Sequence, residues 1–234
     1  MRGSAQKTIV QHGFNSSVSG AEDVWTQGAT WVAPIAATLH HIKSSVTSDD
    51  VGAVGATSVQ VYGLDANYDQ INETVTMNGT TNVTTANEYL RVNRMIVRAA
   101  SDGGFGYNYG NITATTSDAA GTVTCAIAAG ISQSRQAIYT IPHKTVGILR
   151  RLHGGVSYIT AARADISVWI RPQGEVWQLV DGATSVGGTF DTEYSYGLML
   201  PEYSDVRVRA VVNTVSAMNA TMHIELDLKA QGHN

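Results

Sequence analysis

The chain has 234 residues, of which 43% are hydrophobic and 15% charged, and its formal net charge is −4 with a pI of about 5.9. This length allows one large β domain or two smaller ones. Because nucleic-acid-binding domains leave a basic footprint, the net negative charge argues against nucleic acid as a partner. The sequence has no apolar run of the roughly 18 residues that a membrane-spanning helix needs, so we expect no membrane partner.

Cysteine and arginine usage adds two expectations. The one cysteine, Cys125, allows no internal disulfide, so we expect folding in a reducing cytoplasm. Val123 and Ile127 share a strand face with Cys125, which predicts a core thiol rather than a nucleophile. The charged fraction is low, and most basic residues are Arg, whose planar fork suits subunit interfaces.

The first predicted region, residues 1–56, is an N-terminal arm with edge strands. Short strands are expected at 7–11, 23–26 and 39–46, with a loop rich in Ser, Gly and Asn at 14–20. Two interpretations stay open for this region. It is either an arm that orders against a neighbouring subunit or an ordinary edge strand with loops.

The second predicted region, residues 57–130, is a first β domain. A strand at 57–62, a tight polar turn at 63–69 and a strand at 70–77 lead to Asn78-Gly79. Asn-Gly between β-rich runs is typical of a type I′ hairpin turn, in which both central residues have positive φ. The later strands expected in this domain are 83–99, 111–115 and 122–128.

The third predicted region, residues 131–234, is a second, jelly-roll-like β domain that begins after a break at 128–135. Strict alternation places Met222, Ile224, Leu226 and Leu228 on one face and charged residues on the other, which indicates a half-buried antiparallel strand. The expected strands are 136–141, 145–157, 164–171, 175–180, 188–196, 205–213 and 221–229. The predicted fold class is therefore all-β, an antiparallel β-sandwich or jelly roll built as two β domains or one large two-part sandwich.

The segment Val61–Gly79, VYGLDANYDQINETVTMNG, carries a resemblance. Together with Gly55, Ala56 and Val59-Gln60 it is similar to a GLDxxYxxIxETVTxNG segment that recurs in structural proteins of tailed bacteriophages, especially marine ones. The likeness continues patchily at 84–97, 137–145 and 201–209. The matching residues are Gly55, Ala56, Val59, Gln60, Val61, Gly63, Leu64, Asp65, Tyr68, Ile71, Glu73, Thr74, Val75, Thr76, Asn78 and Gly79.

This resemblance implies a setting rather than a reaction. It implies a virion structural protein, assembled in the host cytoplasm, whose partners are the major capsid protein or other virion subunits. Within a virion we expect a head decoration or cement protein that acts as a homo-oligomer, with a trimer as one form. A tail or fibre component, or a glycan-binding jelly-roll module for host attachment, is the alternative.

The sequence offers no convincing catalytic or metal site, so we expect no enzyme, no cofactor and no metal. Asp65, Asn67 and Asp69 begin a calcium-loop pattern, but its glycine and final glutamate are missing, and such residues also suit a turn. Asp191 and Glu193 share a strand face, where solvent-facing charge is the ordinary interpretation. No nucleophile elbow or phosphate loop appears.

Aromatic residues provide the candidate partner-binding positions. Phe105, Tyr107 and Tyr109 lie in a glycine-rich loop, and aromatic side chains on such loops are favoured contact anchors. This loop could equally pack on its own domain or stack on sugar. Trp169, on the polar face of its strand, and Trp177 are the positions expected for an exposed glycan platform.

Overall fold

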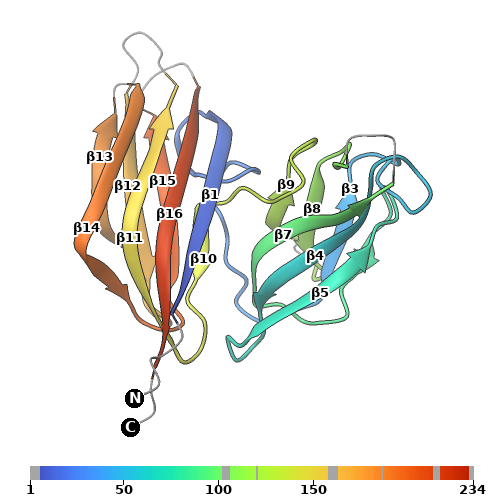
Figure 1. Ribbon diagram of the computed structural model, residues 1–234, viewed down its shortest axis with the longest axis horizontal. Coiled ribbons are helices and arrows are strands. Elements are labelled where there is room, and N and C mark those ends of the chain that lie inside the picture. Colours follow the sequence, from blue (N-terminus) through green and yellow to red (C-terminus); the bar gives the residue numbers. More distant parts are fainter. Residues whose placement is uncertain are drawn as a thin grey trace. The chain divides into compact units, whose positions relative to one another are not determined.

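The computed structural model describes residues 6–101, 106–119, 121–157, 163–185, 187–212 and 217–231, and these residues form sixteen strands and no helix (Figure 1). Every paired strand is antiparallel. The predicted all-β, antiparallel class is therefore confirmed. The chain divides into two compact units, one formed by Met1–Thr30 with Gln136–Asn234 and the other by Trp31–Arg135. We call them unit 1 and unit 2.

Unit 1 contains two sheets. The first has the order β1 (Gln6–Val18), β16 (Met218–Ala230), β11 (Thr145–Val156) and β14 (Gly188–Leu200). The second has the order β10 (Ile138–Thr140), β15 (Asp205–Val212), β12 (Ala164–Arg171) and β13 (Gln178–Ser185), with β2 (Ala21–Asp23) also paired to β15. In Figure 1 the first sheet lies in front of the second. We call them sheet A and sheet B.

The core of unit 1 lies between sheets A and B. Ile224 and Leu226 from β16 pack in the same buried cluster as Val168 from β12 and Val208 from β15. Side chains alternate between the two faces of a strand, so each of these strands turns its polar residues outward. The alternation predicted for β16 is confirmed, and the apolar residues of β12 and β15 also recur at every second position.

Unit 2 also contains two sheets around one core. The first has the order β6 (Val83–Thr84), β3 (His40–Ser44), β8 (Ile112–Thr116) and β9 (Val123–Ile127). The second has the order β5 (Gln70–Thr76), β4 (Ala56–Leu64) and β7 (Arg91–Ala100). The core of unit 2 includes Ile42, Val61, Met95 and Cys125. The predicted burial of Cys125 is confirmed, and burial raises the pKa of its thiol to about 12.

The strand expected at 83–99 divides into β6 and β7, which lie in different sheets. Three further local predictions are wrong. The loop expected at 14–20 is strand as far as Val18, because β1 pairs along β16 and accommodates its polar residues at an irregularity between Asn15 and Val18. The strand expected at 175–180 begins only at Gln178 and runs to Ser185, because its partner β12 fixes the register. The strand expected at 23–26 is instead the short β2, paired to β15. Long-range pairing has overridden local composition in all three.

Asn78-Gly79 does not close a type I′ hairpin. Gly79 has a φ of 55°, but Asn78 does not share the positive φ. After this turn the chain does not pair back onto β5; Asn78 forms a bridge with Asp50, and β6 pairs with β3. The Asn-Gly signal therefore marks a real turn, but a turn between sheets.

The unit boundaries differ from the predicted regions 1–56, 57–130 and 131–234. The boundary at Arg135 lies at the end of the expected break, 128–135. Residues 1–30 belong with the C-terminal part of the chain, whereas 31–56 belong with the middle part. Unit 2 is thus inserted between β2 and β10 of unit 1.

Candidate functional site

The outward surface of sheet B carries both tryptophans that the sequence points to. Trp169 and Arg171 project from β12, Arg207 lies opposite Trp169 on β15, and Trp177 lies just before β13. These positions alternate with core residues such as Val168 and Val208, which is why they share the outer face. We call this surface, with Arg209, Asp23 and Asp205, the arginine–tryptophan face.

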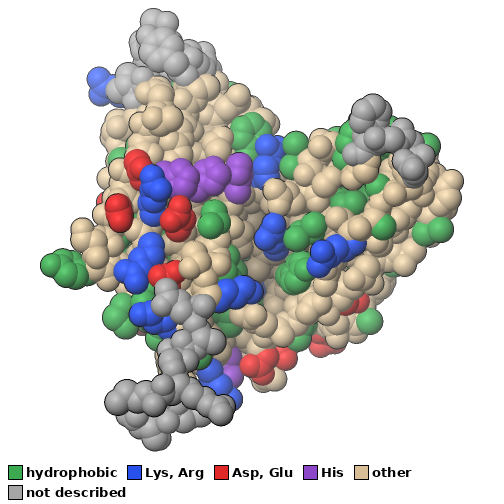
Figure 2. Space-filling view, in the orientation of Figure 1, with side chains coloured by type: hydrophobic (Ala, Val, Ile, Leu, Met, Phe, Trp, Pro, Cys, Tyr) green, Lys and Arg blue, Asp and Glu red, His purple; other side chains and the backbone are tan. Residues whose placement is uncertain are grey.

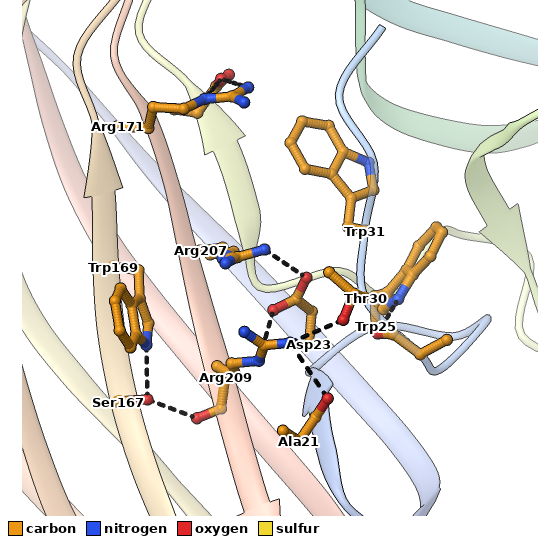
Figure 3. Close-up of polar contacts among 12 residues, drawn as sticks. Ala21, Asp23, Trp25, Thr30, Trp31, Ser167, Trp169, Arg171, Arg207 and Arg209 are labelled. Atoms are coloured by element: carbon orange, nitrogen blue, oxygen red, sulfur yellow. Dashed lines mark hydrogen bonds and ion pairs between the residues drawn. The ribbon is translucent and has the colours of Figure 1, made fainter. Parts of the chain in front are cut away.

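Asp23 forms ion pairs with Arg207 and Arg209 (Figure 3). Arg207 donates from Nη1 to the Asp23 carboxylate at 3.1 Å, and Nε of Arg209 lies 3.9 Å from the other oxygen. Arg209 also donates to the Ala21 carbonyl at 3.2 Å and to Thr30 Oγ1 at 2.7 Å. Asp23 and Arg207 are both buried, so this pair is structural and its disruption would leave a buried charge.

Burial also affects the ionisation of this face. It lowers the pKa of the Arg207 guanidinium, an effect that the Asp23 carboxylate opposes and the neighbouring Arg209 reinforces. Guanidinium groups nevertheless stay charged in proteins. The arginine–tryptophan face therefore carries fixed positive charge rather than a titrating acid or base.

A second ion pair lies beside the first. Arg171 donates to Asp205 Oδ2 from Nε at 3.1 Å and from Nη2, while Asp205 Oδ1 accepts from the Thr140 hydroxyl. Asp205 is 2% exposed, so its two oxygens are committed to β12 and β10. The pair joins three neighbouring strands of sheet B.

Trp177 covers both arginines. Its ring centroid lies 4.0 Å from Cζ of Arg207 and 4.8 Å from Cζ of Arg171, within the range of cation–π attraction. The ring is only partly exposed. Trp177 thus shields the guanidinium groups, and the ring face turned toward them is already occupied.

Trp169 is the more available tryptophan. Its indole N–H donates to Ser167 Oγ at 2.8 Å, and Ser167 Oγ in turn lies 3.4 Å from the Arg209 carbonyl oxygen (Figure 3). The side chain is half-buried, and across β13 its partner is Leu179, which is 58% exposed. This arrangement presents an amphipathic aromatic side chain next to exposed apolar surface.

The other predicted contact residues lie in unit 2. Tyr107 and Tyr109 have ring centroids 5.4 Å apart, and Tyr109 is 39% exposed. The buried Asp49 carboxylate anchors their loop, because it accepts hydrogen bonds from the Tyr109 and Gly110 N–H groups at 2.8 Å. The structure therefore keeps these two tyrosines together in unit 2, whereas both tryptophans belong to unit 1. Phe105 lies outside the described residues.

The alternative chemical sites have structural roles. Asp65 Oδ1 accepts the N–H groups of Asn67 and Asp69 at 2.8 and 2.9 Å, which makes it a turn residue. Asp191 is paired with Arg151 through two hydrogen bonds, and this pairing lowers the pKa of the Asp191 carboxyl. Within the described ranges, no group of three or more His, Cys, Asp or Glu residues could hold a metal ion.

A shallow pocket in unit 2 offers little more. It is lined by residues that include Asp65, Ile71 and Asn87. Asp65 closes its own turn, and the Asn87 N–H donates to Glu73 at 3.0 Å.

The part of the chain that the structure describes contains no helix with the length and apolar character needed to span a membrane.

Comparisons with known proteins add little to this geometry. No protein-family model and no curated protein matches the chain. Among solved structures, infectious bursal disease virus, Gx strain, is 9% identical with a TM-score of 0.22, and the match covers 99% of this chain and 73% of that one. The VP2 subviral particle of the same virus is 10% identical with a TM-score of 0.22, covering 97% and 73%. Likeness at this level carries no argument about fold or function.

Sequence reasoning missed the ion pairs of the arginine–tryptophan face. Arg207 and Arg209 alternate with core residues of β15 and therefore lie on the outer face of that strand. Their partner Asp23 is 184 residues away from Arg207 in the chain, and no local pattern indicates that pairing. Only the pairing of β2 with β15 brings the carboxylate to the arginines.

Proposed function

We propose that this chain is a structural protein of a tailed-bacteriophage virion, a head decoration or cement protein without enzymatic activity. The observation that carries the proposal is the strand order of unit 1. With β2 set aside, the chain changes sheet at every step from β1 to β16 except between β12 and β13. That order is expected of a jelly roll, an architecture common in viral capsid and lectin domains.

The phage-like segment supports the same proposal from unit 2. Residues that carry the resemblance have structural roles: a Cβ at Gly63 would lie 2.0 Å from the Arg91 carbonyl oxygen, and Glu73 accepts the Ala86 N–H at 2.8 Å. Asp65 closes the turn between β4 and β5. The resemblance therefore concerns the scaffold of unit 2, which is what a shared virion module requires.

The edges of unit 1 provide a means of attachment. β13 ends sheet B and β14 ends sheet A, so each has one unpaired edge within the described residues. Exposed apolar side chains gather on or beside these strands: Val176, Leu179, Val180, Tyr196 and Met199. A long, exposed, apolar edge strand is a template for strand addition by another chain. In our proposal a neighbouring capsid subunit covers it.

Copy number in purified particles tests this proposal directly. Mass spectrometry should find about one copy of this chain per major capsid subunit, since a lattice protein follows the symmetry of the shell. The purified chain should also add stoichiometrically to capsids that lack it. A dozen or fewer copies per particle would instead favour the tail or fibre alternative.

Edge variants test the attachment surface. Met199→Glu and Leu179→Glu should reduce binding to capsids about tenfold or more, because each places a charge in an apolar contact. Ile35→Glu is the control, since Ile35 is likewise an exposed apolar residue but lies in unit 2. Equal losses in all three variants would argue against the β13–β14 edges as the contact.

One observation favours a glycan-binding module as the second candidate. Trp169 is a half-buried aromatic side chain on an outer sheet face, flanked by hydrogen-bonding and cationic groups. Binding of the isolated protein on a glycan array, lost in Trp169→Ala and kept in Tyr109→Ala, would support it. Trp177 is a weaker candidate because its ring already packs on Arg171 and Arg207.

A further inference from the structure

Three histidines lie in one row across sheet A. His12 on β1 is directly opposite His223 on β16, and His223 is directly opposite His153 on β11. The ring centroids of His12 and His223 are 4.3 Å apart, and those of His223 and His153 are 4.5 Å apart with nearly parallel rings. Figure 2 shows histidine side chains in a line on the surface of unit 1. All three are partly buried.

Charged groups around the row are on β11, β14 and β16. Glu225, two residues from His223, has a carboxylate oxygen 3.9 Å from His153 Nδ1 and 4.0 Å from Arg151 Nη1. Asp191 on β14 lies opposite His153 and is bound by Arg151. One row further along, Glu193 lies opposite Arg151, and beyond it Arg150 is paired with Asp227 at 2.8 Å. The outward β1 neighbours of His12 are Val10 and Phe14.

Protonation of several imidazoles packed in one row is unfavourable, because the charged rings repel one another. At separations of 4 to 5 Å, like charges repel by about 1 kcal/mol even in bulk water, and by more at a partly buried site. The carboxylates of Glu225 and Asp191 offset charge on His153, but both already interact with Arg151. Protonation of two or three rings therefore costs sheet A free energy.

We propose that the row His12–His223–His153 is an acid-sensitive latch that weakens the docking of β1 on sheet A. At neutral pH the three rings pack against one another. As the pH falls, charge accumulates along the row, and the sheet relieves the repulsion by separating one strand. The proposal goes beyond the proposed function and stands whether or not the chain is a capsid protein.

β1 is the strand that separates because it is an edge. Within the described residues β1 is paired along its length only with β16, whereas β16 and β11 each have partners on both sides. Losing β1 breaks one ladder, whereas moving β11 or β16 breaks two. Release of β1 would expose the edge of β16, which could then pair with another chain.

The sign of the pH effect follows from the middle ring. Burial lowers the pKa of His223, and the neighbouring His153 lowers it further, while Glu225 opposes both. A histidine whose pKa is lower in the folded than in the unfolded state binds fewer protons when folded. Its stabilising effect is therefore complete above the ordinary histidine pKa of about 6.5 and is lost as the pH falls below it.

Hydrogen exchange of the full chain tests the latch. Exchange of β1 amides should be compared between about pH 7.5 and pH 5, with each rate divided by its intrinsic chemical rate and EDTA present to exclude bridging metal. We expect the corrected β1 rates to rise about tenfold for each unit by which the pKa of His223 is lowered in the folded chain. Amides of β12, in the middle of sheet B, should remain protected.

Variants assign the effect to the row. His223→Gln removes the middle ring and should abolish most of the acid response of β1. His12→Phe keeps an aromatic ring that cannot be protonated and should do the same, which decides the matter if His223→Gln does not fold. His41→Gln, a partly exposed histidine in unit 2, should respond like the wild type. A wild-type β1 that stays protected in acid, equal opening of β1 and β12, or a full response in His12→Phe would each overturn the proposal.

Discussion

The carboxylate of Asp49 organises the tyrosine loop of unit 2 at the scale of a single residue. It is fully buried and accepts hydrogen bonds from Ser44 Oγ at 2.6 Å and from the Ala56, Tyr109 and Gly110 N–H groups at 2.8 Å. A buried carboxylate with this many donors fixes the backbone on which Tyr107 and Tyr109 are presented. The exposure of Tyr109 is therefore a consequence of a rigid anchor beneath it.

Asp49→Asn should destabilise unit 2. An amide replaces one acceptor oxygen by an N–H₂ group, so at least one buried donor loses its partner and faces another donor. The expected cost is about 2 to 4 kcal/mol of unfolding free energy. Urea-dependent hydrogen exchange of unit 2 peptides measures it separately from unit 1. Asp50→Asn is the control, because Asp50 Oδ1 only accepts the N–H of the next residue, and equal losses would contradict the anchor role.

The aromatic candidates show what residue-level reading of the sequence could and could not achieve. The polar-face position of Trp169 followed from the alternation of its strand, and the structure places it there. The roles of Asp49 and Asp23 could not be predicted, because the partners of each include groups distant in the chain: Tyr109 and Gly110 for Asp49, and Arg207 for Asp23. The histidine row could not be predicted for the same reason, since His12, His153 and His223 are far apart in the sequence and only the strand register brings them together.

At the scale of elements, β1 is tightly fitted where it crosses the opposite sheet. A Cβ at Gly13 would lie 2.3 Å from the Val24 carbonyl oxygen and 2.5 Å from the Ala137 nitrogen. Both of these are backbone atoms, and Ala137 N–H donates to Val24 O at 2.9 Å. The absence of a side chain at Gly13 therefore sets how closely β1 approaches the segment beside β2 and β10.

Gly13→Ala should destabilise unit 1 by about 2 kcal/mol or more, because the added methyl forces backbone atoms apart in a packed region. Gly20→Ala provides the matched control, since a Cβ at Gly20 meets nothing within 4 Å. Thermal unfolding of both variants beside the wild type is the measurement. A Gly13→Ala protein as stable as Gly20→Ala would show that β1 can shift without cost.

Strand prediction succeeded for strands that bury one face, and it failed for strands whose bounds are set by pairing with a neighbouring strand. In β12, β15 and β16 apolar residues recur at every second position because each strand has one face in the core of unit 1. β13 is an edge strand whose residues are mostly exposed, so its sequence does not alternate between apolar and polar residues and does not indicate where the strand begins and ends. Its position is set by pairing with β12, and pairing between two segments cannot be predicted from the sequence of either segment alone.

At the scale of the whole molecule, the central fact is that one unit interrupts the other. Residues 1–30 fold with 136–234, so the boundary at 30 has no local signature comparable to the Gly/Ser/Gln stretch before 136. Regions predicted from composition follow the chain in order, and they cannot represent a nested arrangement. The antiparallel β class, by contrast, is a property of each strand and was predictable.

The nested arrangement predicts that unit 2 can be removed without unfolding unit 1. Ala29 O accepts the Asp23 N–H at 2.9 Å, Gln136 bridges Trp25, and the Ala137 N–H donates to Val24 O. Both cut ends thus lie beside the same short segment, Asp23–Trp25, and a short Gly-Ser linker can replace 31–135. Because all the core residues of unit 1 come from outside that range, the shortened chain should show a cooperative unfolding transition and a dispersed amide spectrum.

A deletion at the boundaries expected from sequence is the informative comparison. Removing 57–130 instead would leave β3 behind, with Ile42 deprived of its partners Val61, Met95 and Cys125 from the core of unit 2. We expect that chain to aggregate or to expose apolar surface, because a strand with a buried face cannot be stable without the sheet opposite it. Should the 31–135 deletion be the unfolded chain and the 57–130 deletion the folded one, the division into two units would be wrong, and with it the view that unit 1 folds independently of the module inserted in it.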